Sequence, residues 1–336
     1  MNFLNSFTIN KKKIQNYHKP FVIAEIGSNH DQDIEKAKYL INKSAECGAD
    51  AVKIQIFKSH DFGNLNKKIT KIFDENAFNL NWLSKLNNYA KKQNIIFFSS
   101  LFNPRYVSNL ERINTPVYKL ASSEIDNFTL LKKLSNINKP LLISTGMTDI
   151  ENINKTITFL EKLKVNKIAL LQCSSLYPQN INDLNLNVIE TLKNNFPNIP
   201  IGFSDHSESI YPPAFAVSRG ACIIEKHITI DKNDKGPDHS YALTIEQFSE
   251  MIKLINLAYR AGGKFTKELH EIEKKTARRK GLYYNKDIKK GKIINLKDVL
   301  VKNPPNELQL KDIDLILDRK INKNVKKNAP IKESDF

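Results

Sequence analysis

Residues 199–206 read Ile-Pro-Ile-Gly-Phe-Ser-Asp-His, and residues 221–227 read Ala-Cys-Ile-Ile-Glu-Lys-His. Each stretch has the composition of a short β-strand and ends in a histidine beside a carboxylate. Residues 210–219 are long enough for a helical crossover, so the two runs are predicted to be neighbouring parallel strands, which end about 5 Å apart at one edge of a sheet. His206 and His227 would then lie together and suit a divalent metal ion. The alternative is that each histidine makes only local hydrogen bonds.

The same alternation extends along most of the chain. Between about residues 20 and 263, short runs rich in Ile, Val and Phe alternate with longer amphipathic stretches. Helices are predicted, for example, over 34–47, closed by Gly48, and over 150–163, opened by Thr148 and Asp149. Eight strands are predicted, at residues 21–26, 51–56, 95–99, 117–120, 141–144, 168–172, 201–203 and 222–226.

Eight βα units in one domain predict a TIM barrel. A doubly wound open sheet is the alternative, and it is disfavoured because no glycine-rich phosphate loop follows the first strand. The predicted parts are a barrel domain over 1–263, a charged helical linker over 264–280 and a small β-rich domain over 281–336. In the last part, β-type runs are predicted at 281–284, 292–294, 298–301 and 320–321. So short a domain buries little core alone, which favours docking on a partner surface.

Composition excludes several classes of protein. Cys47, Cys173 and Cys222 are widely spaced, as expected of reduced cysteines in a cytoplasmic protein. No signal peptide and no membrane span are expected, because lysines follow closely after the N-terminus and no apolar run is long enough. The net charge is +16, and residues 264–336 carry +9 of it as dispersed lysines. Nucleic-acid binding is therefore not expected, whereas a positive field that concentrates anionic substrates is.

Polar groups follow all eight predicted strands, at the barrel end where active sites lie. Lys53, Lys119 and several serine hydroxyls suit a small phosphorylated carboxylate, because they supply positive charge and hydrogen-bond donors. The two histidines suit a metal ion, and Glu25 could accept a proton from a metal-bound water. Any single serine or lysine here could instead be a cap or a rim salt bridge, so the prediction depends on the whole set.

Eight motifs, in order, carry a family resemblance: AEIGSNH (24–30), KIQ (53–55), YKLASSE (118–124), STGM (144–147), CSSLYP (173–178), GFSDH (202–206), EKH (225–227) and GPDH (236–239). Together they resemble the N-acetylneuraminate (sialic acid) synthase family, which includes legionaminic and pseudaminic acid synthases. The segment from about Arg278, with DIKKG at 287–291, resembles that family's antifreeze-like (SAF) domain. The resemblance covers nearly the whole chain.

The resemblance implies a transferase that condenses phosphoenolpyruvate with an N-acylated mannosamine-type or 2,4-diacetamido hexose, yielding a nonulosonic acid and phosphate. It implies a divalent metal, Mn²⁺ foremost with Mg²⁺ or Co²⁺ as alternatives, bound by His206 and His227, with Glu25 near the reacting centre. It also implies a domain-exchanged homodimer, in which each small domain covers the partner's barrel mouth.

Binding residues follow from the matching motif positions. The resemblance assigns phosphoenolpyruvate to Lys53, Ser100, Lys119, Ser122, Ser144, Ser175 and Ser204. It assigns the sugar to Glu124, Tyr177, Glu225, Asp238 and Asn303.

Two segments depart from the family pattern. The first motif continues Asp31-Gln32 instead of Asn-Gly, and residues 302–305 read Lys-Asn-Pro-Pro instead of Lys-Arg-Pro-Gly. The family's arginine contacts the N-acyl group of the sugar, and Asn303 cannot supply a charged, forked donor. A 2,4-diacetamido hexose is therefore expected to be a better acceptor than N-acetylmannosamine.

Two rival functions stay open at the level of sequence. One is a metal-dependent aldolase that makes or cleaves the same bond with pyruvate, which release of inorganic phosphate would distinguish. The other is a non-catalytic sugar-binding protein with Asn303 as its sign of decay. The retained Glu25, Lys119, His206 and His227 argue against the second rival.

Overall fold

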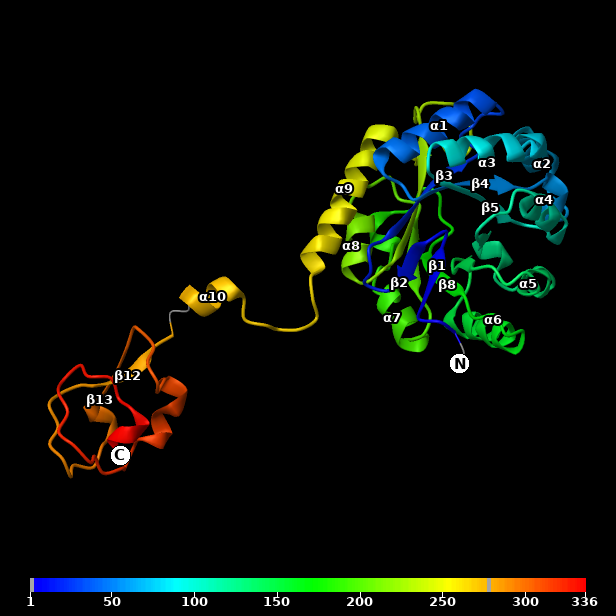
Figure 1. Ribbon diagram of the computed structural model, residues 1–336. Helices are drawn as coiled ribbons and strands as arrows, with labels where there is room; N and C mark the ends of the chain where they lie inside the picture. Colours follow the sequence, from blue (N-terminus) through cyan, green and yellow to red (C-terminus); the bar gives the residue numbers. More distant parts are fainter. Residues whose placement is uncertain (1–2, 277–278) are drawn as a thin grey trace. The chain divides into compact units, whose positions relative to one another are not determined.

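The computed structural model describes residues 3–276 and 279–336, and it divides into two compact units, Met1–Gly263 and Lys264–Phe336. The first unit is a closed barrel of parallel strands surrounded by helices (Figure 1). Each strand pairs with the next, and the last strand returns to pair with the first, so the predicted TIM barrel is confirmed and the open sheet is wrong. The barrel strands are β3 (Phe21–Gly27), β4 (Ala51–Ile56), β5 (Ile96–Leu101), β6 (Tyr118–Leu120), β7 (Leu141–Ser144), β8 (Ile168–Cys173), β9 (Ile201–Asp205) and β10 (Ile223–Thr229).

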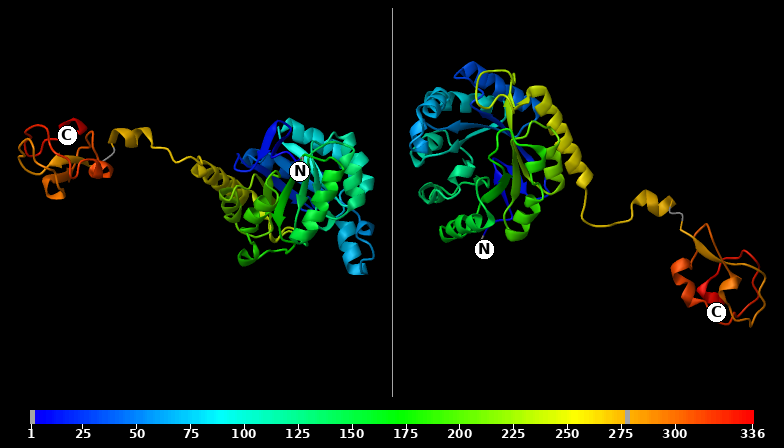
Figure 2. Two further views of the ribbon diagram at one scale, coloured as in Figure 1. Left: turned by 90° about the horizontal axis from the view of Figure 1, so that it is seen from below. Right: turned by 180° about the vertical axis from the view of Figure 1, so that it is seen from behind.

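The helices cover the outside of the barrel, as Figure 2 shows from two further sides. Helix α1 has the predicted bounds, because the Asp33 side chain accepts a hydrogen bond from the Glu35 amide at its start and Gly48 adopts a φ of 90° at its end. Helix α6 begins in the same way after Asp149. The outer helices are α1 (Ile34–Cys47), α2 (Lys67–Glu75), α3 (Leu83–Lys92), α4 (Val107–Arg112), α5 (Phe128–Ser135), α6 (Ile150–Lys162), α7 (Val188–Asn195), α8 (Pro212–Ser218) and α9 (Ile245–Gly262).

An N-terminal hairpin, β1 (Ser6–Ile9) with β2 (Lys12–Gln15), was not expected from the sequence. Its residues Phe7, Ile9 and Ile14 are buried in one cluster with residues at the N-terminal ends of the barrel strands, such as Phe21 and Val117. The hairpin therefore packs against the N-terminal end of the barrel. A last short strand, β11 (Leu243–Thr244), extends the sheet beside β10 and leads into α9.

The second unit has a small core of its own. Strand β12 (Gly281–Tyr284) pairs antiparallel with β13 (Val299–Lys302), and Leu282 and Tyr284 are fully buried in a cluster with Ile294 and Ile331. The runs predicted as strands at 292–294 and 320–321 meet only in one isolated bridge, Ile293 with Lys320. Of the helix predicted over 264–280, the described residues form only α10 (Glu271–Thr276), and residues 277–278 lie outside the described part.

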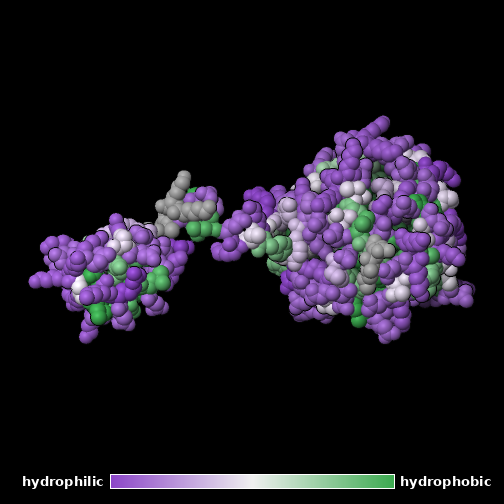
Figure 3. All heavy atoms as spheres, turned by 60° about the horizontal axis from the view of Figure 1, so that its bottom comes forward, coloured by the Kyte–Doolittle hydropathy of each residue, from purple (hydrophilic) through white to green (hydrophobic). Residues whose placement is uncertain are grey.

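Hydrophilic side chains dominate the face shown in Figure 3, as the high content of charged residues implies. Among the described residues, no helix is both long and apolar enough to cross a lipid bilayer.

Candidate active site

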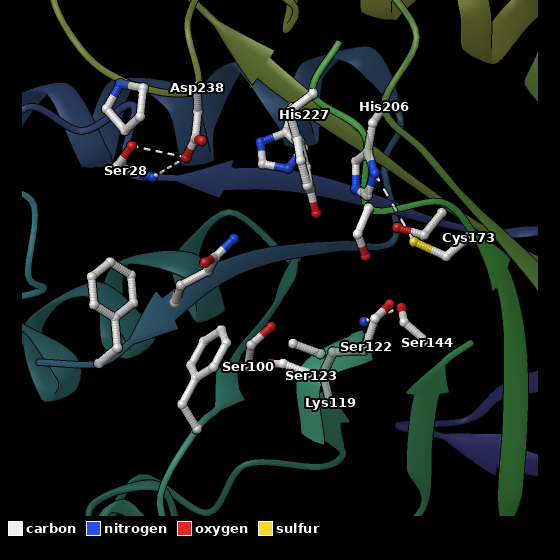
Figure 4. A pocket seen from close by; sticks show the side chains of 18 of the residues that line it. Ser28, Ser100, Lys119, Ser122, Ser123, Ser144, Cys173, His206, His227 and Asp238 are labelled. Atoms are coloured by element: carbon white, nitrogen blue, oxygen red, sulfur yellow. Dashed lines mark hydrogen bonds between the residues drawn. The ribbon is translucent and has the colours of Figure 1, made fainter. Parts of the chain in front are cut away.

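A cavity of about 420 Å³ opens at the C-terminal ends of the barrel strands (Figure 4). All eight barrel strands or the residues directly after them contribute to its lining, which is why sequence reasoning from strand ends found most of it. Twelve of the predicted site residues line this one space. They are Lys53, Ser100, Lys119, Ser122, Ser144, Ser175, Tyr177, Ser204, His206, Glu225, His227 and Asp238.

Three predicted site residues lie elsewhere. Glu25 is fully buried beneath the lining, where one carboxylate oxygen lies 2.8 Å from Lys53 Nζ and the other accepts a hydrogen bond from Gln55. Glu124 does not line the cavity, and its carboxylate accepts a hydrogen bond from the Asn127 side chain. Asn303 belongs to the second unit, so its contact with a sugar stays a prediction.

The two histidines meet as the sequence predicts. In the parallel pairing of β9 with β10, Ser204 lies opposite Glu225 and Asp205 opposite Lys226, and a histidine follows on each strand. The ring centroids of His206 and His227 are 5.6 Å apart. Their side chains lie side by side on one wall of the pocket in Figure 4.

Both imidazoles have the properties of metal ligands. His206 Nδ1 lies 2.6 Å from the Ser174 carbonyl oxygen, so this nitrogen carries the proton and Nε2 keeps its lone pair. His227 Nδ1 is buried and has no hydrogen-bond partner among the described residues. Burial lowers the pKa of His206 to about 3 and that of His227 to about 4. Both rings are therefore neutral near pH 7, the state in which imidazole binds a metal, and the donor set fits a divalent cation.

A second cluster of possible ligands, Asp31, Asp234 and His239, is already neutralised. Lys36 Nζ bonds to both carboxylates, so an ammonium group holds the place that a cation would take. His239 Nε2 lies 2.8 Å from Asp31. This network ties the loop after β3 to the loop that carries Asp238, which gives the unusual Asp31 a structural role.

The floor of the cavity is a cradle for an anion. Lys53 Nζ donates to Ser100 Oγ at 2.7 Å, and Lys119 Nζ donates to Ser144 Oγ at 2.6 Å. The Gly146 amide donates to Ser122 Oγ, and a Cβ at Gly146 would lie 2.7 Å from that oxygen. Glycine at this position thus keeps the space between the serine hydroxyls open. Two buried ammonium groups with surrounding hydroxyls suit a phosphate or a carboxylate.

The pKa values of the two buried glutamates, Glu25 and Glu225, shift in opposite directions. Full burial raises the pKa of Glu25 to about 7; Lys53 offsets part of this effect, and the negative charge of Glu225 adds to it. Burial acts on Glu225 in the same direction, but Lys119 and Lys53 outweigh it and hold the pKa of Glu225 below its usual range. The two carboxyl groups beside the lysines therefore hold a proton with different affinity, a division suited to proton transfer.

Asp238 and Tyr177 line the cavity on the same side as the two histidines. Asp238 accepts hydrogen bonds from the Ser28 amide at 3.0 Å, the Ser28 hydroxyl at 2.8 Å and the Tyr241 hydroxyl at 2.6 Å. Gly27 has a φ of 55°, and a Cβ there would lie 2.6 Å from the Asp238 carboxylate. The Tyr177 ring stacks on His206 with centroids 4.1 Å apart and is 52% exposed, so it can contact a ligand beside that histidine.

Sequence reasoning missed an apolar part of the lining, formed by Phe57, Phe62, Phe73 and Phe102. Phe57 and Phe102 stand two residues after Gln55 and Ser100, so their places beyond two strand ends were a usable signal. Phe62 and Phe73 come from the following loop and from α2, and no local pattern marks them. Ser28, Gln55 and Cys173 also line the cavity.

Comparison with known proteins agrees with this geometry. The model of the NeuB family matches residues 40–267, and that of the SAF domain matches residues 279–336. The N,N'-diacetyllegionaminic acid synthase of Campylobacter jejuni is 34% identical over 333 residues, covering 94% of this chain and 99% of that protein. The human N-acetylneuraminate-9-phosphate synthase is 35% identical over 271 residues, which cover 76% of this chain and 75% of that protein. The crystal structure of the N-acetylneuraminic acid synthetase from Leptospira borgpetersenii superposes with a TM-score of 0.78 at 30% identity, covering 82% and 96%. This chain, a parallel barrel followed by a SAF domain, belongs to the NeuB family.

Proposed function

We propose that this protein is a metal-dependent transferase that joins phosphoenolpyruvate to an N-acylated amino hexose, giving a nonulosonic acid and inorganic phosphate. The observation that carries the proposal is one cavity with two neutral histidines on one side and two buried lysines among serine hydroxyls on its floor. The names of the Campylobacter and human relatives support the same class of reaction.

Phosphoenolpyruvate would bind at the floor. Lys53 and Lys119 would neutralise its charge, and the hydroxyls of Ser100, Ser122 and Ser144 would donate to its oxygens, with Ser175 and Ser204 completing the set. Because the floor is buried, these donors act in a region of low dielectric constant and stabilise the departing phosphate more strongly than water would.

His206 and His227 would hold the divalent cation, Mn²⁺ in our proposal, with Mg²⁺ or Co²⁺ as alternatives. Such an ion, when bound, supplies a Lewis acid that polarises the aldehyde of the acceptor sugar. Tyr177, Glu225 and Asp238 would orient the sugar, because all three line the cavity near the histidines.

Bond formation would begin with attack of the vinyl carbon of phosphoenolpyruvate on the sugar aldehyde. Water would then add to the enol carbon, and the resulting tetrahedral intermediate would expel phosphate. We assign proton transfer in these steps to Glu25, whose raised pKa lets it hold or release a proton near neutral pH. Its hydrogen bond from Gln55 and its contact with Lys53 fix the orientation of the carboxyl group.

The test is an assay of phosphate release with phosphoenolpyruvate and a panel of acceptor sugars. We expect phosphate and nonulosonic acid in equal amounts, and neither product when one substrate is omitted. Product made from pyruvate without phosphate would instead establish the aldolase. Sugar binding without any turnover would establish the non-catalytic binding protein.

Metal binding has its own measurement. Titration of Mn²⁺ followed by electron paramagnetic resonance should show one site in the wild type and none in His206→Ala or His227→Ala. Lys253→Ala is a matched control, because Lys253 is an exposed residue of α9 that pairs with Glu250 and does not line the cavity. We also propose a homodimer, which light scattering after size-exclusion chromatography would test.

A further inference from the structure

The loop between β10 and β11, residues 230–242, carries Asp238 to the cavity. It contains no helix or strand, and of residues 230–240 only His239 is buried. Contacts between side chains therefore have to hold this part of the chain in place. His239 directly follows Asp238, which lines the cavity, so whatever fixes His239 also fixes the backbone that carries the Asp238 carboxylate.

His239 is held by both nitrogens of its ring. Nδ1 lies 2.7 Å from Thr229 Oγ1, and Nε2 lies 2.8 Å from Asp31 Oδ1. The single proton of the Thr229 hydroxyl is donated to the Asp231 carbonyl oxygen at 2.9 Å, so this hydroxyl accepts from Nδ1. The Asp31 carboxylate can only accept, so both ring nitrogens donate and His239 is an imidazolium ion. Because this ring is 0% exposed, its charge depends on Asp31 as a counterion.

Lys36 joins this ion pair to a second point of the loop. Its ammonium group bonds to Asp31 and, at 2.5 Å, to Asp234. Two carboxylates and two cations thus neutralise one another, in a group here named the loop clasp: Asp31, Lys36, Asp234 and His239. Gly236 lets the chain pass close to the clasp, because a Cβ at this position would lie 2.8 Å from the His239 ring.

The clasp and the Asp238 carboxylate join the same two segments of the chain. Ser28 donates to Asp238 from its amide and its hydroxyl, and Asp31 stands three residues further along the same turn. Figure 4 shows the two hydrogen bonds between Ser28 and Asp238. A Cβ at Gly27 would lie 2.6 Å from Asp238 and 3.4 Å from His227 Nδ1, so this carboxylate and this imidazole flank the same stretch of backbone.

The backbone at Asp31 is strained. Asp31 and Gln32 have φ angles of 48° and 57°, in the left-handed region that residues other than glycine adopt at a cost. Such conformations persist where the surrounding structure holds them, and they gather at functional sites. Here the clasp holds Asp31, and the Gln32 side chain donates to the Ala77 carbonyl oxygen at 2.9 Å.

We infer that Asp31 and His239 are positioning residues for Asp238: through the loop clasp they hold its carboxylate where the acceptor sugar binds. This inference rests on the proposed function, in which Asp238 orients the sugar. None of the four clasp residues lines the cavity, so the clasp acts through Asp238 and not by contact with a substrate. Lys53 and Lys119 lie on other strands, and binding of phosphoenolpyruvate should therefore not depend on the clasp.

The experiment measures KM for the acceptor and KM for phosphoenolpyruvate separately, by phosphate release from the full chain with the best acceptor of the panel. In Asp31→Ala the Asp238 carboxylate is no longer held toward the sugar. The KM for the acceptor should rise roughly tenfold to a hundredfold, the value of one hydrogen bond to a charged group, whereas that for phosphoenolpyruvate should hardly change. Asp31→Asn keeps an oxygen that accepts from His239 Nε2 and should raise the KM for the acceptor much less.

Two controls distinguish positioning from general stability. Glu35→Ala removes a carboxylate of the first turn of α1 that is 73% exposed and pairs with Lys38, and it should leave both KM values unchanged. Hydrogen exchange of a peptide covering residues 230–240 should be faster in Asp31→Ala than in Glu35→Ala. In an Asp238→Ala background, Asp31→Ala should add nothing to the KM for the acceptor, because two changes that act through one group are not additive.

The outcomes separate this inference from the proposed function. If Asp31→Ala raises both KM values equally, leaves both unchanged, or still raises the KM for the acceptor when Asp238 is alanine, the inference is wrong and the proposed function stands. If Asp31→Ala does not fold, Asp31→Asn and Lys36→Met decide: each should raise the KM for the acceptor alone, and wild-type values in both would overturn the inference. If the wild type releases no phosphate with any acceptor, both fail.

Discussion

Replacement of Lys226 by methionine should weaken the contacts that fix the positions of both His206 and His227. Lys226 Nζ donates a hydrogen bond to Asp205 at 2.7 Å and another to the Ser207 carbonyl oxygen. Asp205 in turn accepts from the Ser207 amide at 2.9 Å. Asp205 directly precedes His206, and Lys226 directly precedes His227, so one ion pair joins the two strand ends that carry the proposed metal ligands.

The size of the effect follows from burial. The side chains of Lys226 and Asp205 are 1% and 0% exposed, so Lys226→Met leaves a carboxylate without a counterion in the interior. Removal of one partner of such a pair destabilises a protein by about 3–5 kcal/mol. Loss of a group that supports metal ligands typically weakens metal binding by roughly tenfold to a hundredfold. Methionine keeps most of the apolar volume of the lysine stem, so the change tests charge more than packing.

Two measurements on the same variant check this prediction. Urea unfolding should show the loss of stability, and titration with Mn²⁺ should show the weaker site without reference to turnover. Lys232→Met is the matched control. Lys232 lies 3.7 Å from Glu208 in a pair whose side chains are 26% and 58% exposed, and an exposed pair contributes about 1 kcal/mol or less.

The reasoning is refuted if Lys226→Met unfolds at the same urea concentration as Lys232→Met and binds Mn²⁺ with wild-type affinity. Loss of stability with unchanged Mn²⁺ affinity would make the pair a support of the barrel alone. The double variant Asp205→Leu with Lys226→Met removes both charges, and we expect it to recover most of the stability.

Four further predictions concern the chemistry and the second unit. His206→Ala or His227→Ala should abolish turnover, and EDTA should inactivate the wild type until Mn²⁺ is restored; full activity after exhaustive chelation would contradict the metal assignment. Phosphoenolpyruvate labelled with ¹⁸O at the bridging oxygen should give phosphate that keeps the label, since water adds at carbon; mass spectrometry showing unlabelled phosphate would mean attack at phosphorus. We expect the wild type to prefer a 2,4-diacetamido hexose over N-acetylmannosamine by roughly tenfold to a hundredfold in kcat/KM, which corresponds to the free energy of one charge-assisted hydrogen bond. Asn303→Arg should reduce this preference. An unchanged ratio of the two kcat/KM values would show that Asn303 does not take part in sugar recognition. Burial raises the pKa of Asp298, but hydrogen bonds from Lys286, Lys292 and the Asn295 amide outweigh burial and lower this pKa from 3.8 to about 2. The ionised Asp298 therefore contributes about 2 kcal/mol to the free energy of unfolding above pH 4, and this contribution is lost as the pH falls toward 2. Unfolding of the wild type and of Asp298→Asn between pH 5 and pH 2 should converge at the acid end, and parallel curves would contradict the assignment.

Local pattern alone was enough to predict the barrel and its histidine pair. The alternation of buried runs and amphipathic helices depends on the order of apolar and polar residues within each short segment, so it can be recognised in the sequence. Caps such as Asp33 and Gly48 mark helix ends within a few positions. Parallel strands joined by helices must end at one edge, so His206 and His227 had to meet once β9 and β10 were neighbours. The serines and lysines of the floor followed by the same rule.

Only the tertiary structure decided which charges these groups carry and what completes the cavity. Glu25 and Glu225 both lie in predicted strands and both are buried, yet their pKa values shift in opposite directions because Lys119 and Lys53 outweigh burial at Glu225, whereas burial prevails at Glu25. The N-terminal hairpin and the four phenylalanines of the cavity lining bring together segments that are distant in the chain, such as those of Phe62 and Phe102. No local periodicity predicts these contacts, because they depend on how loops and helices pack once the barrel has closed. The sequence by itself therefore determined the scaffold and the strand-end chemistry, whereas packing between distant segments decided the shape, charge and apolar side of the site.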